Sequence, residues 1–403
     1  MESCETKKRL LVNLKIVERC NLNCTYCYFF NSEDQSYQSH PKHLSKEWVL
    51  RIAKFLKKGC EELNVSELNI IFHGGEPLIY PKAKFDWMCS LFTQTFPSNV
   101  SLYFSLQTNG VLIDEKWAEL LLKHEVGVGI SIDGPEIYND KYRVDHKNSG
   151  SYKRVISGLK TLKTGLKAKS NSVGALCVIN PEFSAKVIYE HLSKDLNLKS
   201  FDFIIPDYNH DNPPPFSVEE YGLYLINLFN SWVHDDVSDE DLDLRIMSSS
   251  VGRFFGFSSL LYGTGKVACN QLLPLITISS NGDLGPLDEL RTTDPAFREN
   301  RKNINDISLK EYLDLDIFNQ VTRATESLPV QCSECCWSEI CEGGGLVNRY
   351  SSKNKFDNPS IYCEGLKMFY SHVAKYLLEH GFPLEEMKRN LKLEEAADLE
   401  DVA

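Results

Sequence analysis

Residues 10–27 read LLVNLKIVERCNLNCTYC, an apolar run that leads directly into three closely spaced cysteines. The run Leu10–Val17 is rich in Leu, Ile and Val, which is typical of a strand covered on both faces in a parallel sheet. Cys20, Cys24 and Cys27 fall on the loop that leaves this strand. Three thiolates can ligate three irons of a [4Fe–4S] cubane and leave the fourth iron open to another ligand, whereas a zinc site would need a fourth ligand close by. The loop is therefore predicted to hold a cluster with one open iron.

Apolar runs and amphipathic segments alternate along the first half of the chain. Six βα-type repeats of this kind predict an α/β fold, a partial (β/α)6 barrel resembling a TIM barrel, with its active site at the C-terminal ends of the strands. The expected strands are Leu10–Val17, Leu68–His73, Leu102–Gln107, Val126–Ile132, Val173–Val178 and Phe201–Ile205. The expected helices are Lys46–Glu61, Lys82–Thr95, Glu115–Lys123, Tyr152–Lys163 and Ala185–Lys194.

The alternation stops at residues 207–215, which read DYNHDNPPP. Helices are expected over Val218–Val233 and Glu240–Phe255, and a later one near Leu366–His380. Ser280-Asn281-Gly282 lies between two short apolar runs, Leu275–Ile278 and Asp283–Leu287, and predicts a hairpin. The expected division is a barrel over residues 1–206, a bridging helical region over 207–268 and a C-terminal module over 269–403.

Composition narrows the class of protein. The chain has 403 residues and a formal net charge of -12, which argues against a nucleic-acid surface because phosphates are neutralised by clustered Lys and Arg. No apolar stretch has the length of a membrane span, and the first ten residues lack the apolar core of a signal peptide. A cytoplasmic protein without membrane partners is expected. In that reducing compartment, clustered members of the 13 cysteines are predicted to be ligands rather than disulfides.

Further motifs stand at the ends of the next three expected strands. They are His73-Gly74-Gly75-Glu76-Pro77, Gln107-Thr108-Asn109-Gly110 and Ser131-Ile132-Asp133-Gly134-Pro135, the last followed by Asp140-x-x-Arg143. Together with the three cysteines and Tyr26, they resemble the radical S-adenosylmethionine (SAM) superfamily, and in particular its peptide-modifying branch, which includes the anaerobic sulfatase-maturing enzymes.

The resemblance implies that SAM binds above the first cluster. Gly74 and Gly75 allow close approach of the backbone, and Glu76 offers a negative partner to the ammonium group of SAM. The resemblance also assigns Ser131 and a downstream arginine to the SAM carboxylate, and adds Tyr26 to the cofactor-binding residues. Either Arg143 or Arg154 fits that arginine, and the alternative for Arg143 is a surface ion pair.

A second group of cysteines, Cys332-x2-Cys335-x5-Cys341 and then Cys363, lies in the C-terminal module. Four thiolates complete a cubane with no open iron, and a Cys4 zinc site is the competing interpretation. The spacing resembles the SPASM domain, an auxiliary-cluster module whose full versions use seven cysteines for two clusters. Leu287 and Gly345 stand where that pattern has cysteines. A single auxiliary cluster, and so two [4Fe–4S] clusters in the chain, is expected.

The remaining candidates are left open. Cys269 and Cys336 are either ordinary thiols or ligands of a further metal, and Cys60, Cys89 and Cys177 are expected in the core. Asp288 stands where sulfatase-maturing enzymes carry an Asp suspected of taking a proton from the substrate. It is either that catalytic base or a solvated carboxylate at the hairpin end.

The resemblance to single-auxiliary-cluster maturases, including cyclophane-forming and darobactin-type enzymes, implies a function. A hydrogen atom would leave a side chain of a ribosomally made precursor peptide, and a C–C or C–O cross-link to an aromatic residue would follow. A flavodoxin or ferredoxin would supply electrons. The alternatives are anaerobic sulfatase maturation, which makes formylglycine, and a non-catalytic iron–sulfur protein that binds peptides.

Overall fold

The structure, a computed structural model, describes residues 8–165, 173–235, 242–257, 273–299 and 301–393. It divides into two compact units, each considered by itself below. The first unit comprises Met1–Leu176 and Cys269–Gln320, and the second comprises Cys177–Ala268 and Val321–Ala403. These boundaries differ from the sequence domains 1–206, 207–268 and 269–403, which remain predictions. Within the described ranges, no helix combines the length and apolar character needed to cross a bilayer.

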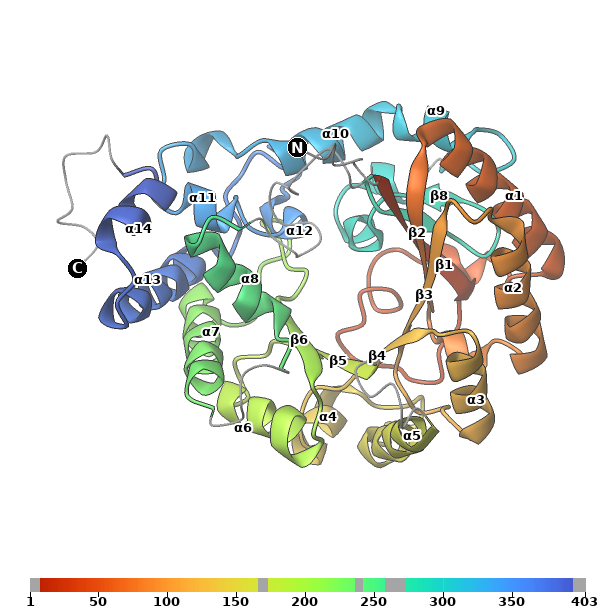
Figure 1. Cartoon of the computed structure of the whole chain (residues 1–403), viewed down its shortest axis with the longest axis horizontal. Helices are drawn as coiled ribbons and strands as arrows, with labels where there is room; N and C mark the ends of the chain where they lie inside the picture. The colour runs from red at the N-terminus through yellow and green to blue at the C-terminus, as the bar shows by residue number, and fades with distance from the viewer. Residues whose placement is uncertain (1–7, 166–172, 236–241, 258–272, 300, 394–403) are drawn as a thin grey trace. The chain divides into compact units, whose positions relative to one another are not determined.

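The first unit is built on a mostly parallel sheet (Figure 1). Its strand order is β5-β4-β3-β2-β1-β7-β8, and the neighbours from β5 to β7 are parallel, whereas β7 and β8 form an antiparallel hairpin. The hairpin turn holds Gly282 at φ 85°, a conformation that favours glycine. The strands are β1 (Lys8–Val17), β2 (Val65–Gly74), β3 (Ser101–Thr108), β4 (Gly127–Ser131), β5 (Val173–Val178), β7 (Ile276–Ile278) and β8 (Leu284–Gly285).

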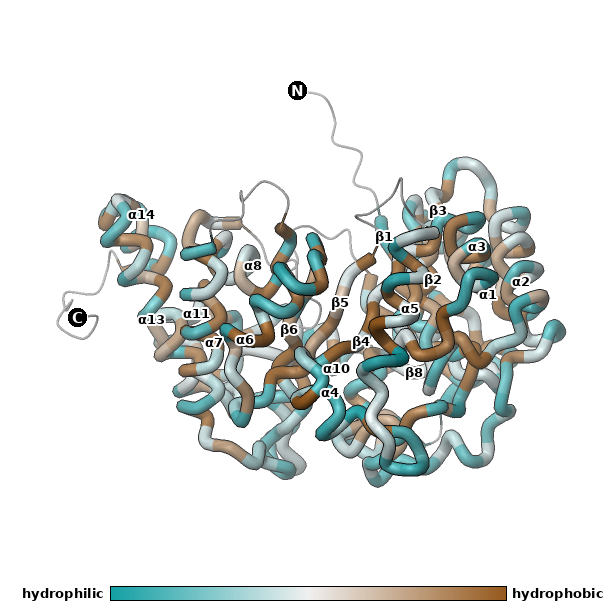
Figure 2. The backbone as a smooth tube through the Cα atoms, turned by 90° about the horizontal axis from the view of Figure 1, so that it is seen from below, coloured by the Kyte–Doolittle hydropathy of each residue, from teal (hydrophilic) through white to brown (hydrophobic). Residues whose placement is uncertain are grey.

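Helices of the first unit follow the strands in sequence. Side-chain caps start two of them, since Ser45 accepts a hydrogen bond from Trp48 N and Asp114 accepts one from Trp117 N. Apolar residues, brown in Figure 2, run along the strands, and Phe72 stacks on Phe104 at 5.5 Å between ring centroids. The helices are α1 (Lys46–Leu63), α2 (Lys82–Thr95), α3 (Glu115–Lys123), α4 (Glu136–Tyr142), α5 (Tyr152–Gly165) and α9 (Leu309–Leu313); α10 (Asp316–Glu326) crosses the boundary between the units.

The second unit holds the sixth barrel strand, β6 (Ser200–Ile204), beside the end of β5, where Ile179 N donates to Ile204 O at 2.9 Å. Its two longest helices, α7 (Val218–Val233) and α13 (Cys363–Glu379), pack through glycines: a Cβ on Gly222 would lie 2.6 Å from Gly365 O. The other helices are α6 (Ala185–Glu190), which continues as a π-helix over His191–Asp195, α8 (Arg245–Phe254), α11 (Ser338–Cys341), α12 (Leu346–Arg349) and α14 (Leu384–Asn390).

The α/β partial barrel expected from the sequence is confirmed, and so is the hairpin over residues 275–287. Several features were not anticipated, among them the helices α9, α10 and α14. Helix α4 was missed, and β7 joins the barrel sheet beside β1 within the first unit. The helix expected to begin at Glu240 begins at Arg245 in the described part of the chain, where residues 236–241 are outside the description.

Candidate functional site

The three predicted cluster ligands lie on the loop that leaves β1. Cys20 Sγ accepts a hydrogen bond from Leu22 N at 3.4 Å, and Cys27 N donates to Cys24 O at 3.0 Å. Burial raises the pKa of Cys20 to about 12 and also raises the pKa values of Cys24 and Cys27. Partly buried thiols of this kind become thiolates when a metal replaces the proton, so the donor set fits an iron–sulfur cluster.

Backbone contacts within the first unit hold this loop in place. Asn23 N donates to Val144 O at 2.8 Å, and Thr25 N donates to Tyr142 O at 3.0 Å. Leu22 also forms an isolated antiparallel bridge with Asp145. The loop is therefore anchored to the end of α4 and the segment after it by hydrogen bonds that do not involve the thiols.

Glu76 lies at the end of β2 and is almost fully buried, with 1% of its surface exposed. Its Oε1 accepts hydrogen bonds from Leu78 N at 2.9 Å and Thr108 Oγ1 at 2.6 Å, and its Oε2 accepts one from Asn109 N at 2.8 Å. Burial raises the pKa of this carboxyl against the effect of these donors. Since a carboxylate has about four acceptor positions, one remains for a ligand ammonium group. Glu76 thus ties the Gly74–Gly75 turn to the end of β3 and still offers an acceptor.

Replacing Glu76 with Ala is expected to weaken both SAM binding and the fold. Each buried donor left without a partner costs about 1–3 kcal/mol, so the free energy of unfolding should fall along with SAM affinity. Glu76→Gln, which keeps two acceptor lone pairs, should lose less of both. Calorimetric titration with SAM and urea denaturation measure the two effects, with iron content expected at the wild-type level.

Glu119→Ala is the matched control, because Glu119 is an exposed carboxylate on α3 paired with Lys116. It should change neither quantity. Wild-type SAM affinity in Glu76→Ala would remove this residue from the cofactor-binding set.

Tyr26, Asp133 and Arg143 form a connected group beside the cysteine loop. Arg143 Nη1 donates to Tyr26 Oη at 2.6 Å, and Tyr26 Oη donates to Asp133 Oδ2 at 2.5 Å. Arg143 Nη1 also lies 3.9 Å from Asp133 Oδ2, and Arg143 is only 7% exposed. The interpretation of Arg143 as a surface ion pair is therefore wrong. Its charge acts on Cys24, where it opposes the effect of burial on the pKa of that thiol.

The predicted ligands of the SAM carboxylate are not joined to one another. Ser131 Oγ accepts a hydrogen bond from Gln107 Nε2 at 2.7 Å. Arg154 lies at the surface, where its Nη2 is 3.0 Å from Asp145 Oδ2. In the described part of the chain, no hydrogen bond or ion pair connects Ser131 with Arg143 or Arg154. The structure brings Arg143 among the buried site residues and places Arg154 in a half-exposed ion pair.

Asp288 belongs to a buried charged group of the first unit. It lies 2.6 Å from Lys15 Nζ and 3.5 Å from Arg291 Nη1, and Tyr28 Oη donates to it at 3.0 Å. Asp288 is 5% exposed and Lys15 is fully buried, so the interpretation of Asp288 as a solvated carboxylate is wrong. Lys15 Nζ and the Arg291 guanidinium also lie over the ring of Phe29, at 3.9 and 4.5 Å from its centroid.

The two cations determine the charge state of Asp288. Burial by itself raises the pKa of Asp288, but the charges of Lys15 and Arg291 outweigh it and hold that pKa well below its usual range. Burial lowers the pKa of Lys15 to about 8, although the charge of Asp288 opposes this. Asp288 is therefore an ionised carboxylate, available as a proton acceptor and weakly basic.

The position of Lys15 places this group at the same end of the sheet as the other motifs. Lys15 of β1 is paired with His73 of β2, directly before Gly74. The sequence reasoning missed Lys15, although a lysine inside the apolar run Leu10–Val17 is a signal, because buried lysines are rare unless paired.

The four predicted auxiliary ligands line one cavity of the second unit. Its volume is about 350 Å³, part of it open to solvent. Each thiolate of a cubane binds a different iron, and among the described residues no three His, Cys, Asp or Glu side chains converge as ligands of one metal ion. Four thiols around one cavity are a donor set that fits a [4Fe–4S] cubane with no open iron. The lining residues are Cys332, Cys335, Trp337, Ser338, Cys341, Gly343, Pro359, Ser360, Cys363, Lys367 and Tyr370.

The other cysteines and Gly345, one of the two altered positions, are placed as follows. Cys336 is not among the lining residues of the cavity, and Cys269 lies outside the described residues. At Gly345, the start of α12, a Cβ would lie 2.6 Å from Asn348 Oδ1. The expected core positions of Cys60, Cys89 and Cys177 are confirmed, since all three are buried.

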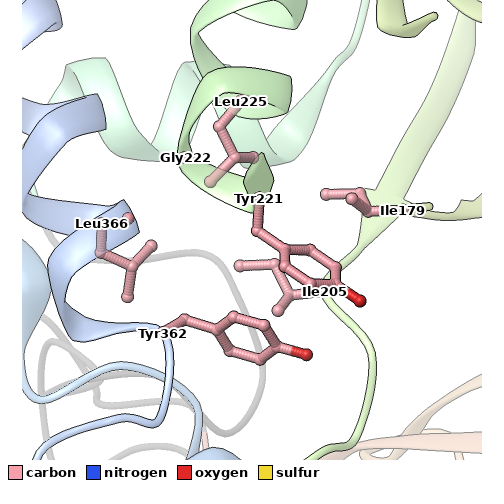
Figure 3. A pocket seen from close by; sticks show the side chains of 8 residues that line it. Ile179, Ile205, Tyr221, Gly222, Leu225, Tyr362 and Leu366 are labelled. Carbon is pink, nitrogen blue, oxygen red and sulfur yellow. The ribbon is translucent and has the colours of Figure 1, made fainter. Parts of the chain in front are cut away.

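A smaller apolar pocket of about 220 Å³ in the second unit is lined by Tyr362, the residue before the candidate ligand Cys363 (Figure 3). Tyr221 and Tyr362 meet edge to face there, with ring centroids 4.9 Å apart. Tyr362 Oη donates to Pro206 O at 3.2 Å and stands directly before Cys363. No charged side chain lines the pocket, and Tyr362 on its wall is the residue directly before α13.

Comparison of the sequence with known proteins supports the resemblance stated above. Residues 14–180 match the radical SAM superfamily. The chain is 26% identical over 371 residues to the cysteine-type anaerobic sulfatase-maturating enzyme of Clostridium perfringens (strain 13 / Type A), covering 89% of this chain and 94% of that protein. It is 25% identical over 382 residues to the serine-type enzyme of Bacteroides thetaiotaomicron, covering 89% and 87%.

The solved structures support the fold in the same way. The structure described as native anSMEcpe with bound AdoMet and Cp18Cys peptide superposes with a TM-score of 0.78 at 24% identity, covering 92% of this chain and 98% of that one. At this identity the likeness concerns the fold. The arrangement of strands that carries the cysteine loop and Glu76 is thus shared with a protein that was solved with AdoMet bound.

Proposed function

We propose that this chain, a radical SAM enzyme related to the anaerobic sulfatase-maturating enzymes, oxidises one residue of a peptide or protein substrate. The observation that carries the proposal is the pair of thiol sites. Three thiols lie on the loop that leaves β1, where the charge of Glu76 acts on Cys20, and four others line one cavity. A radical enzyme that only rearranged its substrate would have no use for a second cluster as an electron acceptor.

Each group has a proposed set of ligands. Cys20, Cys24 and Cys27 would hold the first cluster. SAM would bind at Gly74, Gly75, Glu76, Tyr26 and Ser131, with Arg143 favoured over Arg154 because it is buried beside the loop. Together these groups supply a 5′-deoxyadenosyl radical when bound. Cys332, Cys335, Cys341 and Cys363 would hold the auxiliary cluster, which supplies an electron acceptor.

The first candidate reaction is the conversion of Cys or Ser to formylglycine. The substrate Cβ would lose one hydrogen atom to the 5′-deoxyadenosyl radical and then one electron and one proton. Ser would give the aldehyde directly, whereas Cys would give a thioaldehyde, from which water releases hydrogen sulfide. The similarity to both cysteine-type and serine-type maturating enzymes along about nine-tenths of the chain favours this reaction.

The second candidate is a cross-link to an aromatic residue of a precursor peptide. The substrate radical at Cβ would add to the ring, and loss of one electron and one proton would restore the aromatic system. Leu287 and Gly345 favour this candidate, since they leave cysteines for a single auxiliary cluster. That number of clusters resembles cross-linking maturases.

Asp288 is the proposed proton acceptor in either reaction. Its carboxylate stays ionised beside Lys15, and it lies at the strand ends where the substrate would bind. A low pKa makes it a weak base, but a substrate that has lost an electron is a much stronger acid than the parent residue. Lys15 would act by keeping Asp288 unprotonated before the reaction.

A peptide assay tests the proposal and separates the candidates. The reconstituted enzyme, SAM and a reductant are incubated with sulfatase-motif peptides carrying Cys, Ser or Ala at the target position, and with any short peptide encoded beside the gene. Formylglycine is expected from the Cys and Ser peptides and is detected by capture with a hydrazine reagent and mass spectrometry.

The Ala peptide is the control and should not change. A product that has lost two hydrogen atoms, without an aldehyde, would select the cross-linking candidate. No 5′-deoxyadenosine with any peptide would reject the enzymatic function and select the non-catalytic alternative.

A further inference from the structure

Arg349, the last residue of α12, is a buried cation held by backbone carbonyls. Only 4% of its surface is exposed. Its Nε donates to Phe356 O at 3.1 Å, its Nη1 to Ala324 O at 2.6 Å and its Nη2 to Ser327 O at 3.4 Å. Among the described residues, no carboxylate forms an ion pair with it. The charge of the Asp357 carboxylate acts on it from beyond ion-pair distance. A buried cation without a directly paired anion is unfavourable, so this position favours a further negative charge nearby.

The four-thiol cavity lies next to this guanidinium. Gly343 lines the cavity, and a Cβ built on Gly343 would lie 3.5 Å from Arg349 Nη1. The charge of Arg349 also acts on the thiols, since it opposes the effect of burial on the pKa of Cys332. An anion bound in this cavity would therefore lie close to the guanidinium of Arg349.

Two other cations near these thiols differ from Arg349. Arg253 Nη2 lies 3.1 Å from Glu342 Oε2, and Lys367 Nζ lies 3.0 Å from Glu364 Oε1. Each of them is paired with a carboxylate, whereas Arg349 has no ion pair among the described residues and donates its hydrogen bonds to carbonyl oxygens, with Asp357 farther away.

We propose that Arg349 is the counter-ion of the cluster that Cys332, Cys335, Cys341 and Cys363 would hold, and that it raises the reduction potential of this cluster. The inference rests on the proposed function, in which these four thiols are cluster ligands. Four thiolates outweigh the positive charge of the cubane core, so the cluster is an anion that becomes more negative on reduction. A buried cation stabilises the reduced state more than the oxidised state, which makes the cluster a better electron acceptor.

The test uses the full chain with Cys20, Cys24 and Cys27 replaced by Ala, so that any iron belongs to the second unit. Arg349→Gln and Arg349→Lys are compared in this background by iron content and by spectroelectrochemical titration. Arg349→Gln should lower the midpoint potential, whereas Arg349→Lys, which keeps the charge, should stay closer to the parent value. Arg245→Gln is the matched control, since Arg245 is half-exposed and paired with Asp202, and it should leave the potential unchanged.

The outcomes distinguish an effect of the charge of Arg349 from an effect of the shape of its side chain. Full iron with the parent potential in Arg349→Gln overturns the inference. If Arg349→Gln loses its iron while Arg349→Lys retains it, the charge is required and the inference stands; loss of iron from both variants would show that the shape of the side chain matters instead, and overturns it. A parent protein without iron would refute the auxiliary cluster itself, and so the proposed function, which is a different result from an unchanged potential.

Discussion

Replacing Cys20, Cys24 and Cys27 together with Ala is expected to abolish SAM cleavage and to leave about half of the iron, because two cubanes of about four irons each share no ligand. The structure indicates that the first cluster can be lost without disturbing the second. The loop is held by the backbone bonds from Asn23 and Thr25, and the four-thiol cavity draws its ligands from the second unit only. The variant should therefore fold and keep the auxiliary cluster.

The measurements are iron and sulfide content, circular dichroism, and chromatography of 5′-deoxyadenosine after reduction with SAM. Cys60→Ala is the matched control, because Cys60 is a buried thiol of α1 outside both ligand sets. It should keep the full iron content and SAM cleavage. About twelve irons in the wild type would mean a third cluster, contrary to the argument from Leu287 and Gly345.

Cys335→Ala or Cys341→Ala is expected to separate the two halves of the reaction. The variant should still convert SAM to 5′-deoxyadenosine. The yield of modified peptide should fall to background, because the substrate radical would lack its electron acceptor. Deuterium placed at the attacked Cβ should still appear in 5′-deoxyadenosine. Mass spectrometry of both products, with iron counted beforehand, measures the separation.

Cys336→Ala is the control for this experiment, since Cys336 adjoins Cys335 in sequence and does not line the cavity. It should retain iron and product formation. Because metal binding and folding are coupled in small metal-held modules, circular dichroism must first show that the ligand variants are folded. A folded variant without auxiliary iron that forms product at the wild-type rate would make the cluster structural.

The elements that the sequence predicted well are those with a strong local pattern. Four elements lie over the residues at which they were expected: β5, α2, α3 and α7. Each has a regular apolar pattern that stops at the residues flanking it. α4 was missed since only Asn139 of its seven residues is buried, which leaves no apolar stripe. β7 has three residues, too short a run to indicate that it joins β1.

The candidate site divides in the same way. The candidate cluster ligands and the Gly74–Gly75–Glu76 turn are local motifs, in which spacing along the chain already constrains the ligand geometry, and the sequence by itself predicted them. Lys15 and Asp288 lie far apart in the chain, and only the pairing of distant strands brings them to 2.6 Å. Their charge states, like the surroundings of Arg349, depend on which groups are withdrawn from water together. Desolvation is a property of the packed structure, so only the tertiary fold decided the charge states of Lys15 and Asp288 and the buried surroundings of Arg349.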